Sequence, residues 1–176
     1  MRKTILVTAA VATLSLGLAA PAFADTTGGT GASFALTGGP LSITVPTTVA
    51  PLGTQATGAT PTISGPLGPV TVTDARGLLA AVWTASATST AFTTGAEGPA
   101  ETIANTAVTY TPGATTAPTG GTFTAGPGVA MGASQTAYSE AGDGNNSASW
   151  NPTISVAVPT QAVVGTYNAT ITHSVA

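Results

Sequence analysis

The chain has 176 residues, of which 43% are hydrophobic and only 5% are charged. It contains no cysteine, which excludes disulfide bonds and thiolate metal sites. Two of its three basic residues, Arg2 and Lys3, lie at the N-terminus, so Arg76 is the only one in the rest of the chain. Such a scarcity of positive charge excludes nucleic acid as a partner, because binding to the phosphate backbone requires basic side chains.

The first 24 residues have the pattern of a secretory signal peptide. Arg2 and Lys3 give it a positive start, residues 5–18 form an apolar stretch too short to span a membrane, and Ala22-Phe23-Ala24 is a small-residue cleavage site. Cleavage before Asp25 leaves about 150 residues, enough for one domain. One arginine against six carboxylates gives this mature part a formal charge of −5. We expect it to be secreted, with no membrane insertion of the mature chain.

The composition of the mature part predicts strands rather than helices. Thr, Val, Ala, Gly and Pro dominate, and no segment repeats apolar residues at the three- and four-residue spacing of an amphipathic helix. Short runs alternate between apolar and polar residues and are separated by Gly and Pro. We expect an all-β fold, a single immunoglobulin-like β-sandwich over residues 41–176, after a flexible leader at residues 25–40.

Two short strands open the expected domain. Residues 41–45 alternate and end at Pro46, and residues 62–64 form the second strand. The Pro-, Gly- and Thr-rich residues 47–60 between them predict a long surface loop inside the domain.

The next stretch contains the single arginine of the mature chain. A strand begins at Val70, residues 74–77 form a turn that ends at Gly77, and a second strand runs through Trp83, which together predict a β-hairpin. Asp74 and Arg76 are expected to pair through charge-assisted hydrogen bonds and to fix the corner. The alternative is that Arg76 binds a ligand.

The strand through Trp83 places small residues on one face beside one large ring. Trp83, Ala85 and Ala87 share a parity, so we expect the indole to pack in the core rather than to bind a ligand. A strand is predicted over residues 104–110, ended by Pro and Gly. Residues 115–132 are low in complexity and predict neither a firm structure nor a site.

The most polar loop of the sequence covers residues 140–147. Asp143 and Asn145 are types that bind calcium, but no Glu closes the loop, and a plain turn is favoured. Trp150 follows this loop. It is a candidate glycan contact, because an indole can stack on a sugar ring; the favoured alternative is a ring that closes the edge of the core.

Two strands with clear alternation end the chain, at residues 154–158 and 167–175. The second places Tyr167 and His173 on its apolar face. We expect His173, the only histidine, to be a neutral packing residue with a lowered pKa rather than a ligand or a base. Strand parity predicts these buried residues: Val70, Val72, Trp83, Val108, Tyr110, Ile154, Val156, Tyr167, Ile171 and Val175.

The chemical groups of an enzyme are missing from this pattern. There is one histidine on an apolar face and no cysteine, and the carboxylates are scattered singly. Neither a nucleophile–base pair nor an acid–base pair can be identified. We expect no catalytic activity, no metal and no cofactor.

Three segments resemble the WxL domain of bacterial surface proteins. They are Val72-Thr73-Asp74-x-Arg76-Gly77, then Trp83-x-Ala85, and Gly165-Thr-Tyr167-x-Ala169-Thr-Ile171-Thr near the end. The likeness covers most of the mature chain. The two Trp-x-Leu signatures of that family correspond to Trp83-Thr84-Ala85 and His173-Ser174-Val175, so one Trp and both Leu are replaced.

The resemblance implies a secreted β-sandwich held non-covalently at the cell wall. Its motif residues are Asp74, Arg76, Gly77, Trp83, Tyr167 and His173. The expected function is therefore a non-enzymatic cell-surface module that binds peptidoglycan or a wall-associated surface protein. The alternative is a structural β-sandwich subunit that self-assembles at the cell surface by strand addition, which an uncharged, Thr-rich edge permits.

Overall fold

The structure is a computed structural model that describes residues 27–58 and 62–176. The predicted signal peptide lies outside the described residues. Residues 27–40 contain neither helix nor strand, and their side chains are exposed. Residues 36–176 form a compact β unit. The flexibility expected of the leader stays a prediction.

The regular secondary structure in the described part of the chain is almost entirely β-strand, which confirms the predicted all-β fold class. Its one helix is the short 3-10 helix Asn105–Ala107. The strands are β1 (Leu41–Thr44), β2 (Thr62–Pro66), β3 (Val70–Asp74), β4 (Ala81–Ser89), β5 (Phe92–Thr93), β6 (Thr102–Ile103), β7 (Val108–Thr111), β8 (Thr115–Thr119), β9 (Thr122–Ala125), β10 (Val129–Ala130), β11 (Gln135–Gly142), β12 (Asn146–Trp150), β13 (Thr153–Ala157) and β14 (Ile171–Val175).

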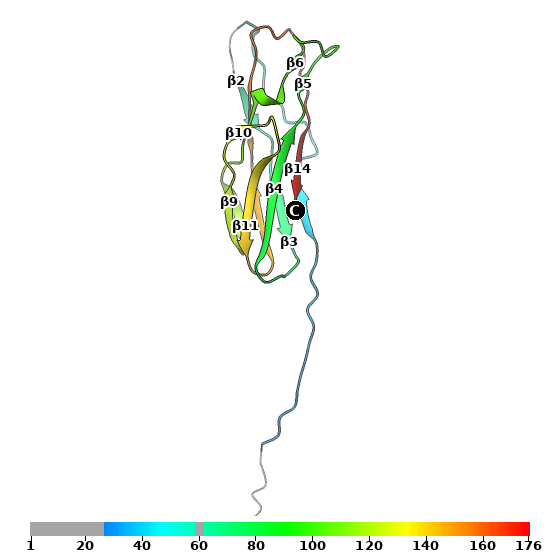
Figure 1. Ribbon diagram of the computed structural model, residues 1–176, viewed down its shortest axis with the longest axis vertical. Coiled ribbons are helices and arrows are strands. Elements are labelled where there is room, and N and C mark those ends of the chain that lie inside the picture. Colours follow the sequence, from blue (N-terminus) through cyan, green and yellow to red (C-terminus); the bar gives the residue numbers. More distant parts are fainter. Residues whose placement is uncertain (1–26, 59–61) are drawn as a thin grey trace, which may run out of the picture. The chain divides into compact units, whose positions relative to one another are not determined.

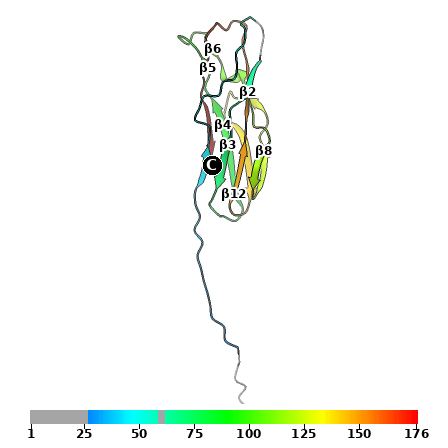
Figure 2. The ribbon, with the colours of Figure 1, turned by 180° about the vertical axis from the view of Figure 1, so that it is seen from behind.

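The strands form two layers of antiparallel sheet. One layer is the sheet β14-β4-β11-β9, seen from the front in Figure 1. The other combines β1-β3-β12-β8 with β10-β7-β13-β2, and Figure 2 shows β3, β12 and β8 from behind. β2 leads into β3, β7 into β8 and β12 into β13, so these two sheets follow one another along the same layer. The immunoglobulin-like topology stays a prediction.

In this second layer, proline and glycine interrupt the hydrogen-bonded ladders of neighbouring strands at the same height along the strands. Pro66, Thr153 and Thr111 are in register on one side of the break, and Val70, Trp150 and Thr115 on the other. The residues in between include Pro112 and Pro152, which have no N–H for a ladder. Two other bonds bridge the break: Leu67 N donates to Pro152 O (2.9 Å), and Gly68 N donates to Asn151 Oδ1 (3.0 Å).

The predicted hairpin through Asp74 and Arg76 is wrong. β3 pairs with β1 and β12, whereas β4 pairs with β11 and β14, so residues 75–80 carry the chain from one layer to the other. Strand parity identified the buried face of each strand correctly, but it does not tell whether two buried faces lie side by side or face each other. The six-residue connection is also longer than a tight hairpin turn, and it has the length to cross between layers.

The core lies between the two layers and contains most of the residues predicted for it. Seven of them are buried: Val70, Val72, Trp83, Val108, Tyr110, Ile154 and Val156. Tyr167, Ile171 and Val175 are only partly buried, because β14 is an edge strand that begins at Ile171, later than predicted. Met131 and Tyr138 are buried although parity did not predict them.

Other predicted boundaries also need correction. Residues 104–107 are not strand, because the 3-10 helix precedes β7. Residues 115–132, which predicted no firm structure, contain β8, β9 and β10; these strands are mostly exposed and so show little apolar alternation. The polar loop is reduced to residues 143–145, because Glu140 belongs to β11 and Asn146 to β12.

Candidate functional site

The corner between β3 and β4 is held by the expected ion pair. Arg76 Nε donates to Asp74 Oδ1 (2.9 Å), and Nη2 donates to Asp74 Oδ2 (2.7 Å) and to Val82 O (2.9 Å). The backbone N–H of Arg76 also donates to Asp74 Oδ1, at 2.9 Å. Asp74 is fully buried, and its bonds with Arg76 lower the pKa of its carboxyl group. The geometry therefore fits the structural interpretation of the pair.

A second crossing, between β11 and β12, is bonded to the first. Asp143 Oδ1 accepts from Ala80 N (2.5 Å), and Gly144 N donates to Leu78 O (2.8 Å). Gly77 in the first crossing has φ of 63°, a left-handed conformation that glycine adopts without strain. Asp143 is thus a turn residue. Among residues 27–58 and 62–176, no three His, Cys, Asp or Glu side chains are grouped to hold a metal ion.

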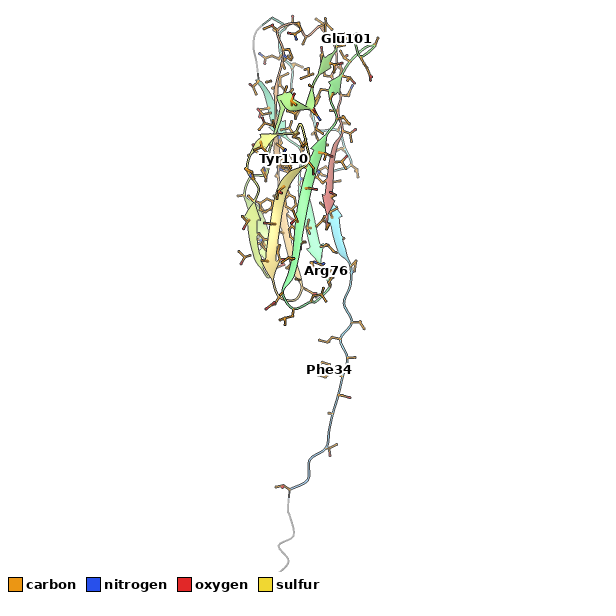
Figure 3. All side chains as sticks on the ribbon, viewed as in Figure 1. Phe34, Arg76, Glu101 and Tyr110 are labelled. Atoms are coloured by element: carbon orange, nitrogen blue, oxygen red, sulfur yellow. The ribbon has the colours of Figure 1, made fainter. Side chains whose placement is uncertain are left out.

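Exposed apolar side chains lie on or beside the β3–β4 corner that contains Arg76. Leu78, Leu79 and Val82 are 51%, 86% and 62% exposed, and Leu36 is 88% exposed. Leu36, Arg76 and Leu78 line one shallow pocket of about 370 Å³. Arg76 itself is 28% exposed, and its Nη1 has no hydrogen-bond partner in the described part of the chain. We call these four apolar residues with Arg76 the corner rim; Figure 3 labels Arg76.

The two tryptophans are core residues, not surface rings. Trp83 is 1% exposed, and its Nε1 donates to Asn146 Oδ1 (2.8 Å) across the two layers. Trp150 is fully buried, and its Nε1 donates to Tyr110 Oη (3.0 Å). The glycan contact considered for Trp150 is therefore wrong. Alternate residues of β12, beginning with Asn146, face the core, and Trp150 shares that parity.

His173 takes part in a neutral chain of hydrogen bonds. Its Nε2 lies 3.1 Å from Tyr110 Oη, which accepts from Trp150; when the ring hydrogen of His173 is on Nδ1, Tyr110 donates to Nε2. The imidazole is then an acceptor at Nε2 and neutral. Burial lowers the pKa of His173 to about 4 and raises the pKa of Tyr110 to about 12. This geometry agrees with the neutral packing role expected of His173, which stays a prediction.

The predicted motif residues do not form one site. Asp74, Arg76, Gly77 and Trp83 gather at the β3–β4 corner. Tyr167 instead donates to Ala100 O and Val163 O, both at 3.0 Å, beside the small β5–β6 sheet. Figure 1 shows that sheet at the end opposite the corner. Tyr167 therefore supports a loop far from the corner.

Sequence reasoning missed two features of the corner. The rim was missed because it needs Leu36 from the leader next to Leu78. Glu140 was assigned to a loop, but it is only 3% exposed in β11. Its even-numbered parity with Tyr138 and Gly142 was the available signal, although a bulge at residues 136–138 weakens it.

Comparison with known proteins gives no match: no family model, curated protein or solved structure is similar to this chain. The WxL resemblance therefore stays a prediction based on the quoted motifs. In the part of the chain that the structure describes, no helix has the length and apolar character needed to cross a membrane.

Proposed function

We propose that the mature chain is a secreted, non-enzymatic module that attaches non-covalently to the bacterial cell wall, through a wall-associated protein or through peptidoglycan. The motif resemblance supports the location at the wall. The corner rim is the observation that carries the proposal, because it is a group of exposed apolar side chains beside the only arginine of the mature chain.

The rim favours a protein over a glycan as the partner. Leucine and valine gain by burial against other apolar side chains, whereas sugar rings are usually bound by stacking on aromatic rings. Both tryptophans are buried, and the rim contains no aromatic residue. Arg76 Nη1 adds a donor for an acceptor on the partner, and its pairing with Asp74 removes the need for a full counter-charge.

The described residues also offer little for catalysis at the rim. Asp74 is occupied by Arg76, Asp143 accepts from the backbone, and His173 is bonded to Tyr110 within the core. Binding is the activity that this arrangement supports.

The test is a pull-down of the mature chain on purified walls of its host. Three preparations are compared: walls with their proteins, protease-treated walls, and sacculi also stripped of accessory polymers. We expect binding to the first preparation alone. Binding to stripped sacculi identifies peptidoglycan as the ligand, and binding to none contradicts the proposal.

Paired variants test the rim itself. The double substitution Leu78→Ser with Leu79→Ser is expected to abolish retention on walls, because it removes apolar surface that the partner covers. The matched control is Val163→Ser with Val164→Ser, which changes two neighbouring exposed residues, 42% and 87% exposed, outside the rim. Equal retention of both double variants would exclude the rim as the binding surface.

Self-assembly by strand addition is the second candidate. It is favoured by β9, the last strand of its sheet, which pairs only with β11 and is rich in threonine. β8, an edge strand of the other layer, is less suited to strand addition, because it contains Pro118 and pairs with β12 in an irregular register. Sedimentation velocity of the mature chain without walls, over a hundredfold range of concentration, would detect such assembly.

A further inference from the structure

Glu140 is a buried carboxyl group without a hydrogen-bond donor. It is 3% exposed, and neither of its oxygens has a partner in the described residues. Nδ2 of Asn146, from the opposite layer, is buried and unpartnered as well. Buried polar groups in native proteins are almost always paired, so three such atoms on two side chains need an explanation.

The surroundings of Glu140 are apolar and tight. On the sheet it lies opposite Trp83 of β4 and Phe123 of β9. A Cβ atom added at Gly121 or Gly142 would clash with its carboxyl group, so the chain closes around it only because these two residues are glycines. An ionised carboxylate in such a site would lose its hydration without gaining a donor, whereas the protonated acid loses much less.

The two charged groups near Glu140 have opposite effects on its ionisation. Asp74, from β3, is negative and raises the pKa of Glu140, as does burial, which is the larger cause. Arg76 has the opposite effect but is already bonded to both oxygens of Asp74. The strands β4, β9 and β12 contribute Trp83, Phe123 and Asn146, none of which carries charge.

The weakest cover of Glu140 is the turn between β8 and β9. Gly120 and Gly121 form it, with φ of 62° and 65°, and β9 is a four-residue edge strand with only Phe123 partly buried. Opening this turn therefore exposes little apolar surface, and local opening is cheapest where few buried contacts are lost.

We propose that Glu140 is a proton-dependent latch: it keeps its proton while the β8–β9 turn is closed, and its ionisation opens that turn to water. The direction follows from linkage. A carboxyl group with a raised folded-state pKa contributes stability that is fully present below its unfolded pKa and is lost as pH rises through the folded one. The inference does not rest on the proposed attachment to the wall.

The first test is a direct titration of the wild-type protein by NMR, with Glu labelled at the side-chain carboxyl carbon. Glu97, Glu101 and Glu140 are the glutamates of the chain. We expect one carboxyl resonance, assigned to Glu140, to titrate at higher pH than the other two. Titration of all three together would overturn the proposal, and no variant is needed for that result.

The second test is hydrogen exchange of amides 120–124 between pH 5 and pH 9, corrected for intrinsic exchange. Wild-type protection is expected to fall by up to about tenfold for each pH unit between the ordinary glutamate pKa of the open turn and the raised pKa of Glu140 in the closed turn, and to level off above it. Glu140→Gln removes the titration and should make protection independent of pH. Glu97→Gln is the matched control, since Glu97 is exposed and far along the chain, and it should behave as wild type. Equal profiles for wild type and Glu140→Gln would also overturn the latch.

Discussion

Two groups of buried polar side chains differ in how completely they are paired. The first group lies at the β3–β4 corner and consists of Asp74, Asn146 and Glu140. It contains one ion pair, between Asp74 and Arg76, and three atoms without a hydrogen-bond partner. Midway along the core, Trp150, Tyr110 and His173 form a continuous chain of hydrogen bonds without formal charge. The difference teaches that neutral donors and acceptors can be paired inside a small sandwich with few side chains, whereas two carboxylates at one end compete for a single guanidinium.

The largest effect is expected from removing the ring that fills the corner. Trp83→Ala should lower the free energy of unfolding by about 3 to 5 kcal/mol, because it deletes a fully buried indole and leaves a cavity. Urea unfolding measures this loss. A loss below about 1 kcal/mol would contradict the burial of Trp83.

Replacing each indole by a phenyl ring compares the two groups directly. Trp83→Phe leaves Oδ1 of Asn146 without its donor, so we expect a loss of about 1 to 3 kcal/mol. Trp150→Phe leaves Tyr110 still bonded to His173, and a loss of only about 0.5 to 1.5 kcal/mol is expected. Urea unfolding of both variants gives the ranking. The reverse ranking would mean that the aromatic chain is the less tolerant group.

The pH response of His173 should be opposite to that of Glu140. Its lowered pKa means that its stabilising contribution is present above the unfolded value of 6.5 and is lost as pH falls toward about 4. Between pH 7 and pH 5, wild type should lose about 1 to 2 kcal/mol more than His173→Leu, a range that allows for partial solvent exposure. Parallel urea-unfolding curves for the two proteins over this range would show that His173 is not coupled to folding.

The smallest effect on stability is expected at the corner rim. Leu79→Ser changes a side chain that is 86% exposed, so the free energy of unfolding should change by less than about 0.5 kcal/mol. Thermal unfolding of the single variant provides the measurement. A larger loss would mean that the rim stabilises the corner, and the pull-down of the double variant would then have to be repeated at equal folded fraction.

Strand parity predicted which residues are buried but not which strands are neighbours. Val70, Val72 and Trp83 were predicted correctly because a period of two follows from backbone geometry alone. The pairing of β3 with β12 is instead a contact within one layer between residues more than seventy positions apart, and no local pattern encodes it. The exposed strands β8 to β10 were missed because exposed strands have no apolar face.

The candidate site was predictable only in its local part. Asp74 and Arg76 are two residues apart, so their pairing follows from spacing and charge. The rim requires Leu36 to line one pocket with residues about forty positions later, and the burial of Glu140 depends on Gly121 of the β8–β9 turn as well as on Gly142 of its own strand. Both are products of the tertiary structure.

The interruption of the second layer by proline and glycine also bears on slippage between strands. The Thr-, Ala- and Val-rich strands of this chain resemble one another, and sliding one of them by two residues would keep every side chain on its proper face. Such a slide would move Pro112 or Pro152 into a ladder position where an N–H is needed. The prolines thus select one strand register among several that the hydrophobic pattern alone would allow.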